Sequence, residues 1–288
     1  LEERSVTAAA KRLNLTQSAM SAGLRRLREA LQDELFVLHG KKMVPTQRAL
    51  ALEPEVRSTI QRLRGIIASG TGFDPATSRR LFRVSASDYV TTVLIAPLMR
   101  VLEREAPHVR IDLTLPNTEA SRRLDAGEID LHISPEIFLQ ADHPKEDLFE
   151  EDHVVAGWEP NPVFAATLSE EAFLASGHVA VRVFDSHTFV ENILAARFPQ
   201  RRVEVIAQSF IQAPWLVAGT NRLTVMYRRL AEATAPILGL RIAEAPFELP
   251  RMRQMMQYHS TRTNDAGLTW LKDHLRRQAQ RIWAPAGR

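Results

Sequence analysis

From residue 80 onward, short apolar runs with the two-residue period of a strand alternate with segments that have the 3.6-residue period of a helix. The predicted strands are residues 81–86, 109–115, 129–134, 178–183, 203–208, 223–227 and 240–245. The predicted helices are residues 88–105, 118–126, 169–175, 188–197, 212–218, 229–235 and 265–282. Because strands that are joined by helices usually pair in parallel through right-handed crossovers, this order predicts a doubly wound α/β fold.

The first 46 residues follow a different pattern, with two short helices and a hairpin. Thr7 begins the first helix, Asn14 and Leu15 form a turn, and Thr16 caps a second helix that extends to Leu31. Residues 35–46 then form a hairpin that turns at Gly40. The apolar residues of the two helices form faces that can be buried only against each other. They are Ala8, Ala9, Leu13, Leu15, Met20, Leu24, Leu27 and Leu31.

The outward residues at the start of the second helix are short and polar, and arginines follow them. Such short side chains can approach base edges in the major groove, whereas Arg25, Arg26 and Arg28 are within reach of phosphates. Lysines at the hairpin tip can lie along the DNA backbone or enter a minor groove. The alternatives are an alanine-rich helical hairpin unrelated to DNA and lysines that are only solvated. The predicted DNA-binding residues are Thr16, Gln17, Ser18, Ser21, Arg25, Arg26, Lys41 and Lys42.

The distribution of charge supports a DNA partner. Residues 1–80 carry 14 Lys and Arg against 8 Asp and Glu, a net charge of +6. Residues 81–288 carry 23 Lys and Arg against 26 Asp and Glu, a net charge of −3. Basic charge on the small N-terminal part is typical of phosphate binding, so we expect a double-stranded DNA operator as partner.

Composition narrows the remaining classes. The 288 residues are enough for two or three compact units with real cores. The chain has no cysteine, which excludes disulfides, thiol nucleophiles and thiolate metal sites. It has no run of 18 apolar residues, so we expect no membrane association and a cytoplasmic location. The first residue is Leu1 rather than an initiator methionine, and no signal peptide opens the sequence.

The N-terminal residues resemble the winged helix-turn-helix of LysR-type transcriptional regulators. The resemblance is carried in register by residues 5–21 and 26–28, by Leu35-Phe36 and by residues 44–46. Two positions depart from the family pattern. Ala22 stands where a basic or long polar residue is usual, and residues 32–34 (Gln-Asp-Glu) replace the glycine that commonly ends the recognition helix. The resemblance implies that a further helix precedes Leu1 and that the replaced glycine leaves the fold intact.

The resemblance extends to the C-terminal part through residues 81–87, 127–131 and 215–219. It implies a two-lobe effector domain of the periplasmic-binding-protein type. Within the family, stretches such as residues 73–76 and 205–219 are most similar to the rhizobial nodulation regulators, which respond to flavonoids. The implied domains are 1–47, the winged helix-turn-helix; 48–72, a linker helix and hinge; and 80–288, the effector domain. Lobe I would hold 80–157 and 263–288, and lobe II 158–262.

Between these domains, Val56, Ile60, Leu63 and Ile67 form a narrow apolar stripe with spacings of 4, 3 and 4. Such a stripe can pair with a second helix or pack on the chain's own core. The family resemblance favours pairing, and thus a homodimer, or a homotetramer if the effector domains also associate. Pro54 is expected to kink this helix or to restart it.

A small molecule would bind where the carboxyl ends of strands in the two lobes face each other. Polar groups beside Tyr89, Phe210 and Tyr227 would suit an aromatic ligand that carries hydroxyls. Some of these residues, such as Ser87 and Asp88, would cap a helix in any case. The predicted effector-binding residues are Ser87, Asp88, Tyr89, Asn117, Ser134, Pro135, Phe210, Gln212 and Tyr227.

Signatures of enzymes are missing from the sequence. It contains no Gly-x-Ser-x-Gly elbow, phosphate loop or Gly-x-Gly-x-x-Gly fingerprint, and none of its nine histidines forms an i, i+4 pair. We therefore expect no catalytic residue, no metal and no cofactor, and interpret the chain as a DNA-binding regulator controlled by a small aromatic effector. Two alternatives stay open: a two-lobe solute-binding or enzymatic protein with an incidental helical N-terminus, and a regulator that needs no ligand.

Overall fold

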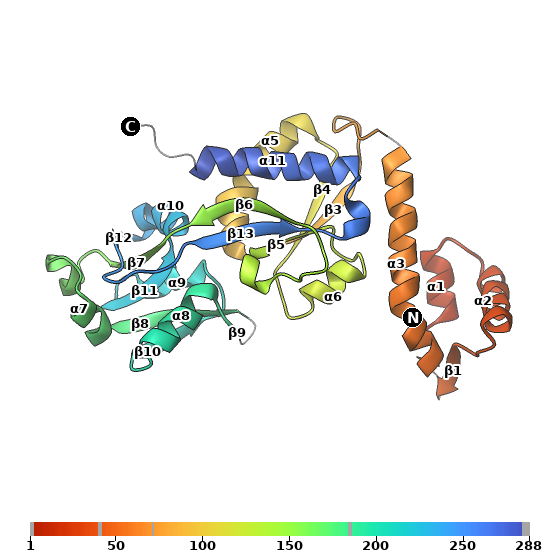
Figure 1. Cartoon of the computed structure of the whole chain (residues 1–288), viewed down its shortest axis with the longest axis horizontal. Helices are drawn as coiled ribbons and strands as arrows, with labels where there is room; N and C mark the ends of the chain where they lie inside the picture. The colour runs from red at the N-terminus through yellow and green to blue at the C-terminus, as the bar shows by residue number, and fades with distance from the viewer. Residues whose placement is uncertain (1–2, 40–41, 71, 184–185, 284–288) are drawn as a thin grey trace. The chain divides into compact units, whose positions relative to one another are not determined.

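The computed structural model describes residues 3–39, 42–70, 72–183 and 186–283 (Figure 1). The chain forms two compact units, Leu1–Arg64 and Gly65–Arg288.

The first unit has the predicted order of two helices and a hairpin. Its elements are α1 (Val6–Arg12), α2 (Gln17–Leu31), β1 (Phe36–His39), β2 (Lys42–Pro45) and the beginning of α3 (Gln47–Gly70). The Thr16 hydroxyl accepts a hydrogen bond from the Ala19 amide at 3.2 Å, which confirms the predicted cap of α2. The cap predicted at Thr7 is wrong, because α1 begins at Val6 and is capped by Ser5, two residues before Thr7. β1 and β2 pair antiparallel, as predicted for the hairpin.

The turn after α2 keeps its shape without the family's glycine. Gln32 adopts the left-handed conformation, with φ of 51°. Asp33 then accepts hydrogen bonds from the Thr46 hydroxyl at 2.7 Å and from the Leu35 amide at 2.6 Å, and these bonds lower the pKa of its carboxyl. The Arg28 guanidinium donates to the Glu34 carbonyl at 2.7 Å. Arg28 therefore stabilises this turn, and its contact with phosphates stays a prediction.

The two helices bury less apolar surface than the pattern predicts. Ala10 is the buried residue of α1, and α2 has none. Leu13 is 62% exposed and Leu27 is 53% exposed. The expectation that all eight apolar residues bury each other is therefore wrong, because the two turns of α1 are too short to cover the four turns of α2.

Helix α3 is continuous through Pro54, so the helix does not restart there. Val56, Ile60 and Leu63 are all exposed, so these members of the stripe do not pack on the chain's own core. The side chain of Ile67 lies outside the described residues.

The second unit contains two mixed five-strand sheets, the second with the short β9 added beside β8. The first has the order β4-β3-β5-β13-β6, in which β3 is parallel to β4 and β5, and β13 is antiparallel to β5 and β6. The second has the order β10-β8-β11-β7-β12, in which β7 is antiparallel to its two neighbours. The first-sheet strands are β3 (Leu81–Ser85), β4 (Arg110–Thr114), β5 (Leu131–Pro135), β6 (Lys145–Glu151) and β13 (Met252–Gln257). The second-sheet strands are β7 (His153–Trp158), β8 (Gly177–Val183), β9 (Ser186–His187), β10 (Val203–Ala207), β11 (Arg222–Tyr227) and β12 (Leu240–Ala243).

The two-lobe α/β architecture is thus confirmed. The predicted parallel pairing is only partly correct, because β6, β7 and β13, which were not predicted as strands, form antiparallel pairs. The chain passes from the first sheet to the second at Asp152 and returns between β12 and β13. The predicted lobe boundaries near residues 157 and 262 are therefore displaced. β7 belongs to the second sheet and β13 to the first.

Every predicted helix is present with small shifts at its ends. The predicted helix 88–105 is a continuous helical stretch made of α4 (Asp88–Val90), a π-helical turn η1 (Thr91–Ile95) and α5 (Ala96–Glu105). Helices α5 and α11 pack against each other beside the first sheet (Figure 1). The remaining helices are α6 (Ala120–Asp125), η2 (Glu136–Phe138), η3 (Pro162–Ala165), α7 (Glu170–Ala175), α8 (Phe189–Arg197), α9 (Gln212–Val217), α10 (Arg228–Leu238), η4 (Ser260–Arg262) and α11 (Ala266–Trp283).

The segment that precedes β3 is fixed to the start of α11. The Arg80 guanidinium donates two hydrogen bonds to the buried Asp265 carboxylate, at 2.5 and 2.7 Å. The Phe73 ring packs on Trp270, with ring centroids 5.1 Å apart. Gly267 permits this close approach, because a Cβ atom there would lie 2.4 Å from an Arg80 nitrogen.

Candidate DNA interface and effector cavity

The first candidate site is the N-terminal part of α2. Gln17, Ser18 and Ser21 are exposed there, as are Arg25 and Arg26 about one turn beyond Ser21. Among the described residues, no carboxylate forms an ion pair with Arg25 or Arg26. A surface of short polar side chains followed by unpaired guanidinium groups can contact bases and phosphates together.

Two further predicted residues adjoin this surface in sequence. The Thr16 hydroxyl already caps α2 and lies 3.0 Å from the Ser18 hydroxyl. Lys42 is exposed at the start of β2, whereas Lys41 lies outside the described residues.

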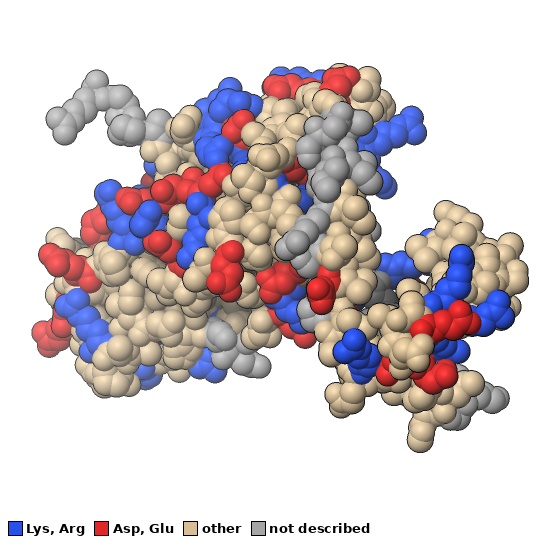
Figure 2. Space-filling model, turned by 45° about the vertical axis from the view of Figure 1, so that its right-hand side comes forward, with Lys and Arg blue, Asp and Glu red and all other residues tan. Residues whose placement is uncertain are grey.

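The charges of the second unit are arranged differently. Acidic and basic side chains are interspersed on its visible face (Figure 2). Several form ion pairs, such as Arg253 with Glu136 at 2.8 Å and with Asp147 at 2.6 Å. Such mixed pairs give no continuous basic surface for phosphates.

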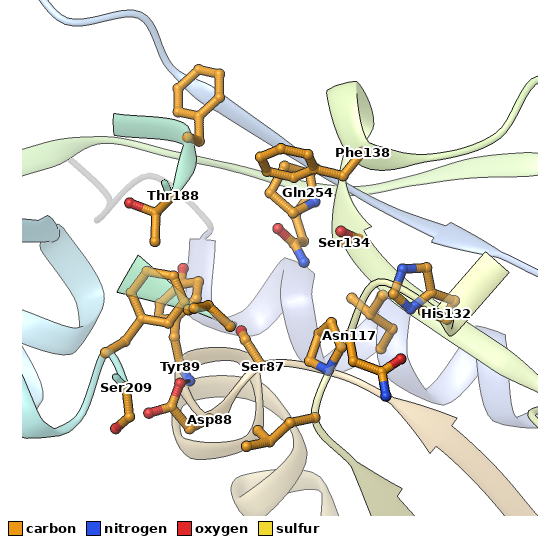
Figure 3. Close-up of a pocket in the computed structure, with 18 of the residues that line it drawn as sticks. Ser87, Asp88, Tyr89, Asn117, His132, Ser134, Phe138, Thr188, Ser209 and Gln254 are labelled. Atoms are coloured by element: carbon orange, nitrogen blue, oxygen red, sulfur yellow. Dashed lines mark hydrogen bonds between the residues drawn. The ribbon is translucent and has the colours of Figure 1, made fainter. Parts of the chain in front are cut away.

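The second candidate site is a cavity of about 320 Å³ between the lobes of the second unit (Figure 3). Its walls come from the strand ends and helix starts of both sheets, as the topology of an open α/β fold dictates. The structure brings eight of the nine predicted effector residues together in its lining. They are Ser87, Asp88, Tyr89, Asn117, Ser134, Pro135, Phe210 and Tyr227.

The ninth predicted residue, Gln212, does not line the cavity. Its side-chain oxygen accepts a hydrogen bond from the Gln208 backbone amide at 3.2 Å. Its backbone amide donates to the Ser209 hydroxyl at 3.3 Å. The side chain is thus turned back onto the loop that precedes α9, and its predicted place in the cavity is wrong.

Two of the lining residues also hold the fold together. The Ser87 hydroxyl caps α4 by accepting from the Val90 amide at 3.2 Å. The Asp88 carboxylate accepts from the Ile211 amide of the other lobe at 3.0 Å. The expected capping role is therefore present, and Asp88 in addition joins the two lobes at the edge of the cavity.

Three aromatic rings form one side of the cavity. The Tyr89 and Tyr227 ring centroids are 4.2 Å apart, and Phe210 lies 5.2 Å from Tyr227. The Tyr89 hydroxyl donates to the buried Glu151 carboxylate at 2.6 Å, and the Trp283 indole donates to the same carboxylate at 3.1 Å. Burial raises the pKa of Glu151 and, together with the nearby Glu151 charge, raises that of Tyr89. The rings therefore offer an apolar face, while the Tyr89 hydroxyl is already engaged.

Sequence reasoning missed several polar residues of the lining. His132 is buried and burial lowers its pKa to about 4, so its imidazole is neutral at pH 7. Thr188 precedes α8, but its hydroxyl does not cap the helix and has no hydrogen-bond partner among the described residues. Gln254 comes from β13, which was not predicted as a strand. No Lys or Arg is among the described residues that line the cavity.

Comparison with known proteins identifies the two parts of the chain in which these candidate sites lie. Residues 1–50 match the family described as bacterial regulatory helix-turn-helix protein, lysR family, and residues 75–280 match the LysR substrate binding domain. The chain therefore belongs to the LysR family of transcriptional regulators, whose members bind DNA and small-molecule effectors.

Its relatives include the nodulation proteins D. It is 36% identical to nodulation protein D 1 of Rhizobium leguminosarum bv. phaseoli over 287 residues, which are 99% of this chain and 91% of the relative. It is 37% identical to nodulation protein D 2 of Sinorhizobium fredii over 288 residues, 99% of this chain and 92% of the relative.

Solved structures show the same architecture. A probable transcriptional regulator of Pseudomonas aeruginosa is 31% identical with a TM-score of 0.68, covering 95% of this chain and 92% of the other. The fold is also that of a full-length OxyR of Pseudomonas aeruginosa, which is 19% identical with a TM-score of 0.74 and covers 95% of this chain and 90% of the other.

The family assignment decides between the classes that the sequence left open. The chain is a transcription regulator rather than an enzyme or a solute-binding protein with an incidental N-terminus. Among the helices of the described residues, none is long and apolar enough to cross a membrane.

Proposed function

We propose that this regulator is controlled by an uncharged, hydroxylated aromatic compound, such as a flavonoid, that binds in the cavity between the lobes. The observation that carries the proposal is the pairing of three aromatic rings with neutral polar groups in a space of about 320 Å³. This volume is at the lower end of the range that holds small organic ligands. Because no described lining residue is a Lys or Arg, a carboxylate ligand would enter without a counter-ion.

The Asp88–Ile211 hydrogen bond suggests how occupancy can be transmitted. It links the two lobes beside Tyr89 and Phe210, so a ligand against these rings favours one arrangement of the lobes over another. Regulation requires only that the ligand prefer one arrangement. A tenfold change in the regulatory equilibrium needs about 1.4 kcal/mol of differential affinity.

For the N-terminal unit, we propose that Gln17, Ser18 and Ser21 contact base edges of an operator in the cytoplasm. The phosphates are bound by Arg25 and Arg26 of α2 and by Lys41 and Lys42 of the hairpin. The exposed stripe of Val56, Ile60 and Leu63 supports a homodimer formed through α3. Such a dimer would present two recognition helices to adjacent half-sites.

The effector proposal is tested by calorimetry of the full chain with 5,7-dihydroxyflavone. Phe210→Ala removes a ring from the cavity wall and should weaken binding about tenfold or more, since a lost aromatic contact costs one to several kcal/mol. Phe247→Ala is the matched control, because Phe247 is also half-buried but packs on Phe173 and Phe198, outside the cavity.

Operator affinity without ligand, measured by gel shift, should be the same for both variants and the wild type. The absence of binding by any hydroxylated aromatic compound would refute the proposal. Binding that is unchanged in Phe210→Ala would place the site elsewhere.

A further inference from the structure

Strand β13 carries a buried amide that the fold does not use. Gln254 is 2% exposed and lies on β13, which is flanked by β5 and β6 in the first sheet. Its amide points into the cavity (Figure 3). Among the described residues, neither side-chain atom of Gln254 has a hydrogen-bond partner. Because this amide borders the cavity and no described residue pairs with it, its donor and acceptor are available to a molecule in the cavity.

A second glutamine on the same strand shows what a structural role looks like. Gln257 is 1% exposed, and its side-chain nitrogen donates to the Gln140 carbonyl at 2.8 Å. It thereby ties β13 to the loop before β6. Gln254 has the same burial and the same chemistry, but its free donor and acceptor face the cavity instead of a loop.

The neighbours of Gln254 define what it can recognise. Ser134, on the neighbouring strand β5, also lines the cavity, and its hydroxyl makes no hydrogen bond with a described residue (Figure 3). The amide offers one acceptor and two donors, and the hydroxyl offers both functions. Neither group carries charge, and the Asp88 carboxylate in the same lining disfavours an anion.

We propose that Gln254 determines effector specificity by hydrogen bonding an uncharged carbonyl or hydroxyl group of the ligand, with Ser134 as the adjacent partner. This inference rests on the proposed function, since it assigns a role within the same cavity. It adds that the effector carries a neutral polar group on the side that faces β13 and β5. Effectors that lack such a group bind only through the rings.

The test is Gln254→Met, which keeps the length of the side chain and removes its hydrogen-bond donor and acceptor. Calorimetry of the full chain would use four probes: flavan, which has neither carbonyl nor hydroxyl, flavone, 5,7-dihydroxyflavone and 5,7,4′-trihydroxyflavone. We expect Gln254→Met to weaken at least one of the three polar probes about tenfold and to change flavan less than twofold. Equal weakening of flavan and the polar probes would mean that Gln254 only packs, and no weakening would mean that the ligand does not reach it.

Gln257→Met provides the control and a second measurement. Removing the unpaired Gln254 amide should leave the melting temperature of the free protein unchanged or raise it, whereas Gln257→Met should lower it by leaving the Gln140 carbonyl unpaired. A melting temperature that falls equally in both variants would assign Gln254 a structural role and overturn the inference. If the wild type binds none of the four probes, the proposed function fails together with the inference. If it binds them with the same ranking in Gln254→Met, only the inference fails.

Discussion

Replacing Asp265 with Asn should destabilise the second unit far more than any surface charge change. The Asp265 side chain is 1% exposed and accepts hydrogen bonds from Arg80, from Arg262 at 2.8 Å and from the Leu268 amide at 3.0 Å. Asparagine keeps the shape but loses the charge, and its amide hydrogens oppose guanidinium donors. Removing one partner of a buried ion pair costs about 3–5 kcal/mol, because the other partner stays buried without compensation.

The pKa of this carboxyl gives an independent magnitude. Burial alone would raise the pKa of Asp265, but the Arg80 hydrogen bonds and the Arg262 charge lower it from 3.8 to about 2. Because the pKa is lower in the folded state, the stabilisation is present above pH 4 and is lost as the pH falls towards 2. At neutral pH this lowered pKa corresponds to a stabilisation of the folded state of about 2 kcal/mol.

Urea unfolding followed by tryptophan fluorescence measures this directly. All four tryptophans, at 158, 215, 270 and 283, lie in the second unit, so the signal reports on that unit alone. Asp273→Asn is the matched control on the same helix, since Asp273 is 44% exposed and pairs with Arg276 across one turn. We expect that control to change the free energy of unfolding by less than about 1 kcal/mol. If Asp265→Asn costs no more than Asp273→Asn at pH 7, the reasoning from burial is refuted.

Three other variants test the DNA-binding and dimer proposals. Gln17→Ala should lose about 1–3 kcal/mol of discrimination at one or two base pairs, and an unchanged ranking of operator variants in gel shifts would contradict base readout by Gln17. Lys42→Ala should weaken specific and nonspecific DNA alike and flatten the salt dependence; loss at the specific site alone would speak against a phosphate contact. Leu63→Glu would place a charge in the proposed dimer seam and should convert the dimer to monomer in light scattering, at a cost of several kcal/mol. A dimer that persists with wild-type operator affinity would show that the stripe is not the seam.

Local rules were enough to predict the N-terminal unit. The cap at Thr16, the hairpin and the polar start of α2 depend on residues within a few positions of each other. The error at Thr7 was also local, since Ser5 is an equally good cap. What could not be predicted there was the turn after α2, because the Asp33–Thr46 hydrogen bond joins residues 13 apart.

The cavity was predictable only as far as its strands were. Strands of branched and alternating residues, such as β4 and β5, placed Asn117 and Ser134 correctly. Strand β13, with the sequence Met-Arg-Gln-Met-Met-Gln, is made of long unbranched residues that favour helices. It is a strand because β5 and β6 flank it, which no local window contains. Gln254 could therefore not be predicted as a cavity residue, because its strand depends on pairing with residues distant in the sequence.

The central place of β13 also sets the order in which the protein can be assembled as it is synthesised. Strands β5 and β6 are complete by residue 151, but the strand that separates and joins them is not made until residue 257. Until about a hundred further residues have left the ribosome, both strands present unpaired backbone groups, a state that invites association between nascent chains. The second sheet, in contrast, is complete at residue 243 and can close first. The lobe that comes first in the sequence is thus the last to be finished.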